Sequence, residues 1–161
     1  TNIVTAVSGA WLESRELLII GGQVKTADLA RGLVRSRGIQ EIDGQRLLES
    51  TTKLSVRLES PVPAAEFGKL LEPSWTPRKG PVFIEFPLDV QAATIAPEQF
   101  APLSRPKLPL ISEAELQRLV SLYDRAERPI LLIGGGIDHA TACGLRDTLL
   151  AKRVPVMTTY N

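Results

Sequence analysis

The sequence predicts an α/β protein in which helices cover a parallel sheet. Short, predominantly apolar segments recur at 17–20, 82–86 and 130–133, and each is bounded by glycine or proline on at least one side. Such strands are typical of parallel sheets, whose two faces are both buried. Segments with apolar residues at helical spacing separate them, which is the alternation of an α/β fold.

The first helix and strand follow from local spacing. Ile3, Val7 and Trp11 lie on one helical face, which predicts a helix over 2–13. The apolar segment 17–20 then predicts a strand that is buried on both faces and stops at the Gly21-Gly22 pair.

The next elements are predicted with different clarity. For 26–38 a short helix and an irregular loop fit the pattern equally well, because a glycine and several polar positions interrupt the apolar spacing. Alternation over 54–58 predicts a half-buried strand, and Pro63 is suited to the first position of a helix. A strand over 82–86 is bounded by prolines.

Proline density divides the chain. Four prolines fall between 97 and 109 and no periodic apolar face survives among them, so 92–110 is predicted to link a domain at 1–91 to a second at 111–161.

In the second part, Ser112 and Glu115 have capping-box spacing and predict a helix start. Four residues are expected to form its buried stripe: Leu116, Leu119, Val120 and Tyr123. A strand at 130–133, a glycine turn, a helix and a strand at 154–157 form a strand–helix–strand unit.

Composition excludes several classes of protein. Nineteen Lys+Arg face 18 Asp+Glu, a net charge of +1, so the basic surplus of a nucleic-acid-binding domain is lacking. No apolar stretch approaches the roughly 20 residues that cross a bilayer. The single Cys143 cannot form an internal disulfide, and we expect a cytoplasmic protein. The start at Thr1 without Met predicts a piece of a longer protein.

The glycine turn is the sharpest chemical feature. Gly134, Gly135 and Gly136 follow a strand and precede a helix, an arrangement that suits a phosphate group or equally a tight turn that needs glycine only for steric reasons. His139 stands where the dinucleotide fingerprint needs glycine, and we expect it on the surface. Cys143 is expected to be a buried small hydrophobe, not a nucleophile.

Acidic residues cluster at 40–44 and after the third strand. Glu41 and Asp43 could serve acid–base chemistry or a cation, but a solvated loop is the favoured interpretation, as it is for Glu85 and Asp89.

Eight short motifs, taken in order, resemble one family. They are Thr1-Asn2, Glu13-Ser14, Gly21-Gly22-Gln23-Val24, Ile39-Gln40-Glu41-Ile42-Asp43, Thr52-Lys53, Lys79-Gly80-Pro81-Val82, Phe86-Pro87-Leu88-Asp89-Val90-Gln91 and Gly134-Gly135-Gly136. Their order and spacing resemble the thiamine-diphosphate-dependent enzymes of the acetolactate synthase type.

The resemblance implies a domain organisation and a chemistry. Residues 1–91 would be the later part of a pyrimidine-binding domain, and 111–161 the start of a Rossmann-like central domain. The catalytic glutamate and the Mg²⁺ ligands would lie outside this chain, which alone would be inactive. Thiamine diphosphate would supply the electron sink for carboligation or decarboxylation of 2-keto acids such as pyruvate. A homodimer or homotetramer is implied, with no nucleic-acid or membrane partner.

The resemblance also implies site residues. Gln40 matches a catalytic glutamine that reaches the reacting centre and the cofactor, and Lys53 a lysine near the substrate channel. Asn2 and Ser14 match contacts to thiamine diphosphate. Some members of the family also bind FAD, and the positions that match FAD contacts are Arg78, Gly134, Gly135, Gly136, Thr159 and Tyr160.

Two departures from the family pattern bear on the acceptor substrate. Ile39 replaces an aromatic residue and Leu88 a lysine, which implies a carboligase or decarboxylase with a different acceptor. The alternative from another class is a non-catalytic FAD-binding or interaction module.

Overall fold

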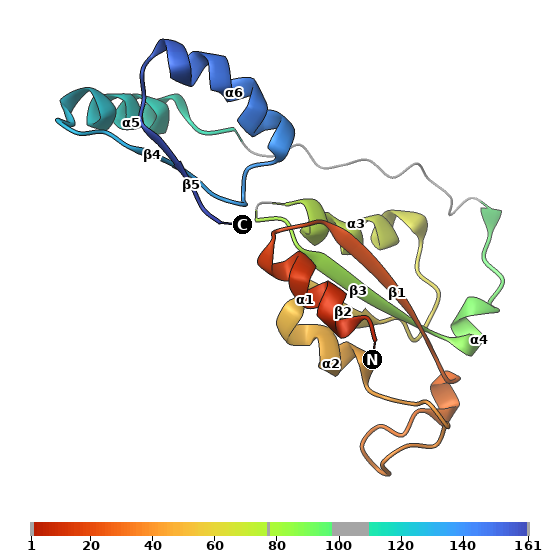
Figure 1. Ribbon diagram of the computed structural model, residues 1–161. Helices are drawn as coiled ribbons and strands as arrows, with labels where there is room; N and C mark the ends of the chain where they lie inside the picture. Colours follow the sequence, from red (N-terminus) through yellow and green to blue (C-terminus); the bar gives the residue numbers. More distant parts are fainter. Residues whose placement is uncertain (1, 77, 98–109, 161) are drawn as a thin grey trace. The chain divides into compact units, whose positions relative to one another are not determined.

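The computed structural model describes residues 2–76, 78–97 and 110–160 (Figure 1). The chain divides into two compact units, Thr1–Pro106 and Lys107–Asn161, and each has its own parallel sheet. Most of the predicted link, 98–109, lies outside the described residues, including Pro102, Pro106 and Pro109. The link and the domain limits at 1–91 and 111–161 therefore stay predictions.

The first unit is a three-stranded parallel sheet with the strand order β1-β3-β2. The strands are β1 (Leu17–Gln23), β2 (Leu54–Arg57) and β3 (Pro81–Pro87), and β1 pairs with β3 from Leu17 opposite Pro81 to Gln23 opposite Pro87. Three α-helices pack on the sheet: α1 (Val4–Leu12), α2 (Gly44–Leu48) and α3 (Ala64–Trp75). The predicted α/β class with parallel strands is confirmed.

Side chains of β3 alternate between two apolar clusters. Phe83 packs with Val7 of α1 and Leu48 of α2 on one face, whereas Val82 and Ile84 pack with Leu71 of α3 on the other. This period-two alternation in a strand buried on both faces explains why β3 is almost continuously apolar. Glu85 shares the face of Phe83, so the alternation carries a charged residue into the core.

The prediction that the first strand stops at Gly21 is wrong. The strand continues to Gln23 because β3 offers ladder partners as far as Pro87, and backbone pairing needs no side chain. A Cβ on Gly21 would lie 2.8 Å from the Phe83 ring, so glycine allows the close approach of the two strands here.

Burial of this strand on both faces is also wrong within the described residues. Leu18 and Ile20 are 41% and 62% exposed. They point to the face that carries α3, but the apolar side chains of α3 pack over β2 and β3 and not over these two residues.

Several boundaries shift or appear only in the structure. The segment 26–38 is mostly irregular, with one 3₁₀ turn, η1 (Thr26–Asp28), and Pro63 is the N-cap residue, not the first helical residue. Three short helical elements, α2, η2 (Glu49–Thr51) and α4 (Leu88–Gln91), were not predicted, because three to five residues carry no measurable periodicity.

The second unit is a strand–helix–strand arrangement preceded by a helix. Its elements are α5 (Glu113–Arg125), β4 (Leu131–Ile133), α6 (His139–Ala151) and β5 (Val156–Thr158), and β4 and β5 are parallel. The predicted capping box is confirmed: Glu115 N donates to Ser112 Oγ over 3.3 Å, and Ser112 N donates to Glu115 Oε2 over 3.0 Å. The last strand begins two residues later than predicted.

Burial predictions for the second unit are wrong. No residue from 110 to 160 is buried, and the stripe Leu116, Leu119, Val120 and Tyr123 is exposed. Cys143 is exposed too, with its Sγ 3.5 Å from His139 Nε2, whereas His139 is on the surface as expected. Two helices on a two-stranded sheet are too few to enclose a core.

None of the helices in the described ranges is long and apolar enough to cross a membrane.

Candidate functional site

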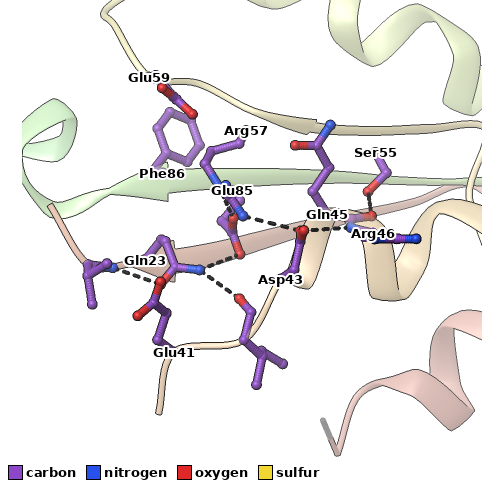
Figure 2. A network of polar contacts seen from close by, with 12 residues as sticks. Gln23, Glu41, Asp43, Gln45, Arg46, Ser55, Arg57, Glu59, Glu85 and Phe86 are labelled. Carbon is purple, nitrogen blue, oxygen red and sulfur yellow. Dashed lines mark hydrogen bonds and ion pairs between the residues drawn. The ribbon is translucent and has the colours of Figure 1, made fainter. Parts of the chain in front are cut away.

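The candidate site lies at the carboxyl edge of the sheet in the first unit, where β1, β2 and β3 all end. Ligands of open parallel sheets bind beyond this edge. Four polar residues meet there and are called the carboxyl-edge network: Gln23, Asp43, Arg57 and Glu85 (Figure 2).

Glu85 is the centre of this network and is only 3% exposed. Arg57 Nε donates to Glu85 Oε2 over 2.5 Å, and Gln23 Nε2 donates to Glu85 Oε1 over 3.3 Å and to the Ile42 carbonyl over 2.8 Å. The buried charge is therefore paired and hydrogen-bonded, as a stable interior requires. The interpretation of Glu85 as a solvated strand end is wrong, because its face of β3 points into the core.

Asp43 connects the network to α2. Its carboxylate accepts from Arg57 Nη2 over 3.3 Å and from Arg46 N over 3.1 Å, so it also caps the helix. The next residue must be small: a Cβ on Gly44 would lie 2.5 Å from Glu85 Oε1. The segment 40–44 is an exposed loop over most of its length, as expected, with Gln40, Ile42 and Asp43 exposed, and it is anchored to the sheet at its end.

Glu41 and Asp89 hold loops at the same edge. Hydrogen bonds from the backbone N–H groups of Arg37, Ala30 and Gly38 lower the pKa of the Glu41 carboxyl group. The Thr26 hydroxyl, 2.5 Å from Asp89 Oδ2, and the Thr26 N–H lower the pKa of Asp89 in the same way. Both oxygens of each carboxylate therefore accept hydrogen bonds within the chain.

These two lowered pKa values predict acid sensitivity of the loops. A folded-state pKa below the unfolded value means that the stabilisation is present above about pH 4 and is lost as the pH falls through the lowered values. We expect amides of Thr26, Ala30, Arg37 and Gly38 to lose hydrogen-exchange protection as the pH falls below about 4, after correction for intrinsic rates. The Phe67 amide, bonded to Pro63 O in α3, is the control. Parallel behaviour of the two sets would contradict the prediction.

Gln40 has a different environment from these acidic neighbours. It lies with Ile39 at the tip of a turn closed by Glu41 N and Gly38 O, 3.3 Å apart. Its side chain is exposed and makes no hydrogen bond to any other residue in the described ranges. Asn2 is likewise exposed, before α1. The predicted catalytic glutamine thus has a free amide on a held turn.

Three other predicted site residues gather at the opposite, amino edge of the sheet. Ser14 is buried with a φ of 56°, and its hydroxyl accepts from Arg78 Nε. Arg78 Nη2 also donates to the Leu12 carbonyl over 3.3 Å. Lys53 donates to the carbonyl of Arg78 over 2.6 Å and to both oxygens of Thr76, and burial lowers the pKa of this lysine. All three hydrogens of its ammonium group have acceptors inside the chain.

A cavity of about 340 Å³ opens beside these residues. Its lining is Trp11, Leu12, Lys53, Arg78 and Lys79. The cavity is lined by three cationic side chains and one indole ring, which together suit an anionic ligand with a flat apolar part. Lys53 is already bonded within the chain, and Lys79 pairs with Glu16 over 3.2 Å, so a ligand would compete with these contacts.

In the second unit, Gly134 and Thr159 lie side by side at the carboxyl ends of β4 and β5. Thr159 N donates to the Ile133 carbonyl over 3.0 Å, and a Cβ on Gly134 would lie 3.7 Å from the Thr159 side chain. A Cβ on Gly136 would meet open space, and Gly135 and Tyr160 are exposed. A carboxylate of the chain itself already lies at the first turn of α6, because Asp138 is the N-cap residue and accepts a hydrogen bond from Thr141 N over 3.0 Å.

No cluster of His, Cys, Asp and Glu in the described ranges could hold a metal ion.

Comparison with known proteins shows which enzymes this chain is similar to. No protein-family profile matches it. It is 30% identical over 170 residues to the probable acetolactate synthase large subunit of Methanocaldococcus jannaschii, covering 99% of this chain and 27% of that protein. It is 30% identical over 166 residues to glyoxylate carboligase of Escherichia coli O157:H7, covering 99% of this chain and 26% of that protein.

The acetolactate synthase isozyme 1 large subunit of Escherichia coli K12 is 32% identical over 164 residues, covering 99% of this chain and 27% of that protein. The chain therefore spans about a quarter of the length of the curated relatives it matches. Over nearly its whole length this chain is a homologue of the thiamine-diphosphate-dependent enzymes of the acetolactate synthase type, and the resemblance carried by its motifs is confirmed.

Proposed function

We propose that this chain forms part of a thiamine-diphosphate-dependent carboligase or decarboxylase acting on 2-keto acids. The observation that carries the proposal is the exposed, unbonded amide of Gln40 on a held turn at the carboxyl edge of a parallel sheet. Residues 1–91 would supply part of the pyrimidine-binding domain and 111–161 the start of the central domain. The active form would be a homodimer or homotetramer, and the 161 residues alone would be inactive.

The described residues fit a pyrimidine-side contact. Gln40 and Asn2 each offer an amide with both donors and an acceptor available, which suits a heteroaromatic ring that presents both kinds of group. Thiamine diphosphate, when bound with Mg²⁺, would supply the electron sink for cleaving and forming bonds next to a carbonyl. Gln40 would orient the reacting groups, and the Mg²⁺ ligands would lie in residues beyond these.

The acidic residues at this edge would not move protons in the reaction. Glu41, Asp43, Glu85 and Asp89 all accept hydrogen bonds from backbone or side-chain donors of this chain. A general base must instead be able to reach the substrate proton. These four residues would keep the loops in place, and Gln40, which lies on one of these loops, would contact the reacting groups.

The acceptor substrate would differ from that of acetolactate synthases. Ile39 and Leu88 are both exposed; Leu88 directly follows the carboxyl end of β3, and Ile39 lies in the long loop that follows β1. Neither can pair with a carboxylate, whereas a cation at such a position can hold one by a charge-assisted hydrogen bond. We propose that the acceptor is a carbonyl compound without a carboxylate group, such as an aldehyde.

Two substitutions in the full-length protein test this function. Gln40→Ala is expected to lower kcat/KM for 2-keto acid consumption by roughly 100-fold, the effect of losing a donor aimed at the reacting atoms. Gln45→Ala, at the second residue of α2 and at the same edge, is the matched control and should change little. Leu88→Lys is expected to shift acceptor preference towards a 2-keto acid. Full activity of Gln40→Ala would refute the proposed role.

A second candidate function is FAD binding, with or without catalysis. It is favoured by the cavity lined by Lys53, Arg78, Lys79 and Trp11, which suits an anion with a flat ring. Within the second unit, the glycine turn at 134–136, with Thr159 and Tyr160, would by itself offer backbone N–H groups to a phosphate, although the Asp138 carboxylate adds negative charge there. Flavin absorption of the gently purified full-length protein, lost in Arg78→Met, would support this function. A colourless wild-type protein would exclude it.

A further inference from the structure

We propose that Glu41 is a positioning residue whose carboxylate holds the 38–41 turn so that the Gln40 amide stays at the carboxyl edge of the sheet. The inference rests on the proposed function of Gln40. It assigns Glu41 a role in the reaction that acts only through its neighbour.

The two carboxylate oxygens of Glu41 bind different parts of the loop. Oε2 accepts from Arg37 N over 2.6 Å and from Gly38 N over 3.1 Å, at the start of the turn. Oε1 accepts from Ala30 N over 2.7 Å. Ala30 and Leu29 are both buried, so this second oxygen ties the turn to a segment that is packed in the core.

The turn that carries Gln40 is closed from both sides by the same residue. Glu41 N donates to the Gly38 carbonyl over 3.3 Å, while the Glu41 carboxylate accepts from Gly38 N. Gly38 itself packs against Val24, since a Cβ at Gly38 would lie 2.7 Å from Val24 Cγ1. Ile39 and Gln40 are thus the two central residues of a turn with little freedom left.

The rest of the loop offers few other restraints. Residues 31–37 are exposed, and the side chains that bond out of this stretch are Arg31, which pairs with exposed Glu59, and Arg37, which reaches the Ala27 carbonyl over 3.4 Å. Glu41 is not part of either apolar cluster. Its loss is therefore expected to free the turn without unfolding the sheet.

The chemistry of the acceptor makes a conservative variant informative. In Glu41→Gln one acceptor oxygen becomes an NH₂ group, which can only donate. In either orientation of the amide, its NH₂ group faces backbone N–H donors. Either the Ala30 N–H or the N–H groups of Arg37 and Gly38 therefore lose their acceptor. A carboxylate is required, not merely a polar side chain of the same size.

The experiment compares Glu41→Gln, Gln40→Ala and the double variant in the full-length protein with thiamine diphosphate and Mg²⁺. Glu41→Gln is expected to lower kcat by roughly 10- to 100-fold with little change in KM, the effect of a slightly misplaced group. It should lower the thermal midpoint by less than about 2 °C. Because Glu41 acts through Gln40, the double variant should be no slower than Gln40→Ala alone.

Hydrogen exchange supplies a readout that needs no turnover. The amide of Ala30, or those of Arg37 and Gly38, should exchange faster in Glu41→Gln, while the Phe67 amide in α3 is unchanged. Glu59→Gln, which removes the exposed pair with Arg31, is the matched control and should leave both rate and exchange as in wild type.

The outcomes separate the two proposals. Full activity of Gln40→Ala overturns the proposed function. If Gln40→Ala is slow, then a fully active Glu41→Gln, additive effects of the two substitutions, or unfolding of Glu41→Gln each overturn the positioning role.

Discussion

Replacing Arg57 with methionine is expected to lower the free energy of opening of β2 and β3 by about 3–5 kcal/mol. The guanidinium is the charged partner of Glu85, 2.5 Å from its carboxylate, and the two side chains are only 14% and 4% exposed. Methionine keeps most of the apolar stem but leaves a buried carboxylate with Gln23 as its one other side-chain donor among the residues that the structure describes. The decrease in free energy is large because the buried Glu85 carboxylate would no longer have a charged partner.

Hydrogen exchange of the β3 amides in the full-length protein measures this effect without assuming that the whole chain unfolds in one step. Arg31→Met is the matched control, because the Arg31–Glu59 pair is exposed and should contribute less than about 1 kcal/mol. Equal effects of the two substitutions would show that burial of Glu85 does not set the cost. Glu85→Gln should be milder than Arg57→Met, since Arg57 keeps Asp43 as a partner.

Ile84→Ala is expected to have the second largest effect, about 2–5 kcal/mol. Ile84 is 0% exposed in the middle of the central strand, and it packs with Leu58, Leu71 and Val82 beneath α3. Truncation removes buried apolar area and leaves a cavity that β-sheet neighbours on both sides cannot close.

The same exchange measurement on β3 tests this prediction. Ile39→Ala is its control, because Ile39 is fully exposed at a turn tip and buries no apolar area in the described structure. A loss of less than about 1 kcal/mol for Ile84→Ala would mean that the cluster beneath α3 collapses around the gap.

Much of the fold could be predicted from local pattern. The strands at Val56 and Phe83 and the helix capped by Ser112 follow from alternation, apolar runs and a capping box, all of which act over a few residues. Short elements escaped prediction because they depend on distant partners. Helix α2 begins where Asp43 caps it and Gly44 fits against Glu85, a residue of β3.

Less of the candidate site could be predicted. Glu85 stands inside the apolar run of β3 and on the same face as Phe83, which indicates a buried carboxylate with a charged partner. No local sequence pattern identifies Arg57 or Gln23 as its partners. The resemblance supplied Gln40, and the structure adds the free amide and the turn beneath it. The role proposed for Glu41 depends on its hydrogen bond with Ala30 N, which lies eleven residues earlier in an irregular segment and which no sequence pattern predicts.

The sequence by itself determined the α/β class, the parallel strands, the helix start at Ser112 and the family, because these depend on periodicity and on short motifs that survive without their surroundings. Only the tertiary structure decided which predicted residues meet. It placed Ser14, Lys53 and Arg78 at the amino edge of the sheet and Gln40 at the carboxyl edge. The physical reason is that the pairing order of the strands and the contacts between distant loops, which no local pattern encodes, decide which side chains lie together at each edge.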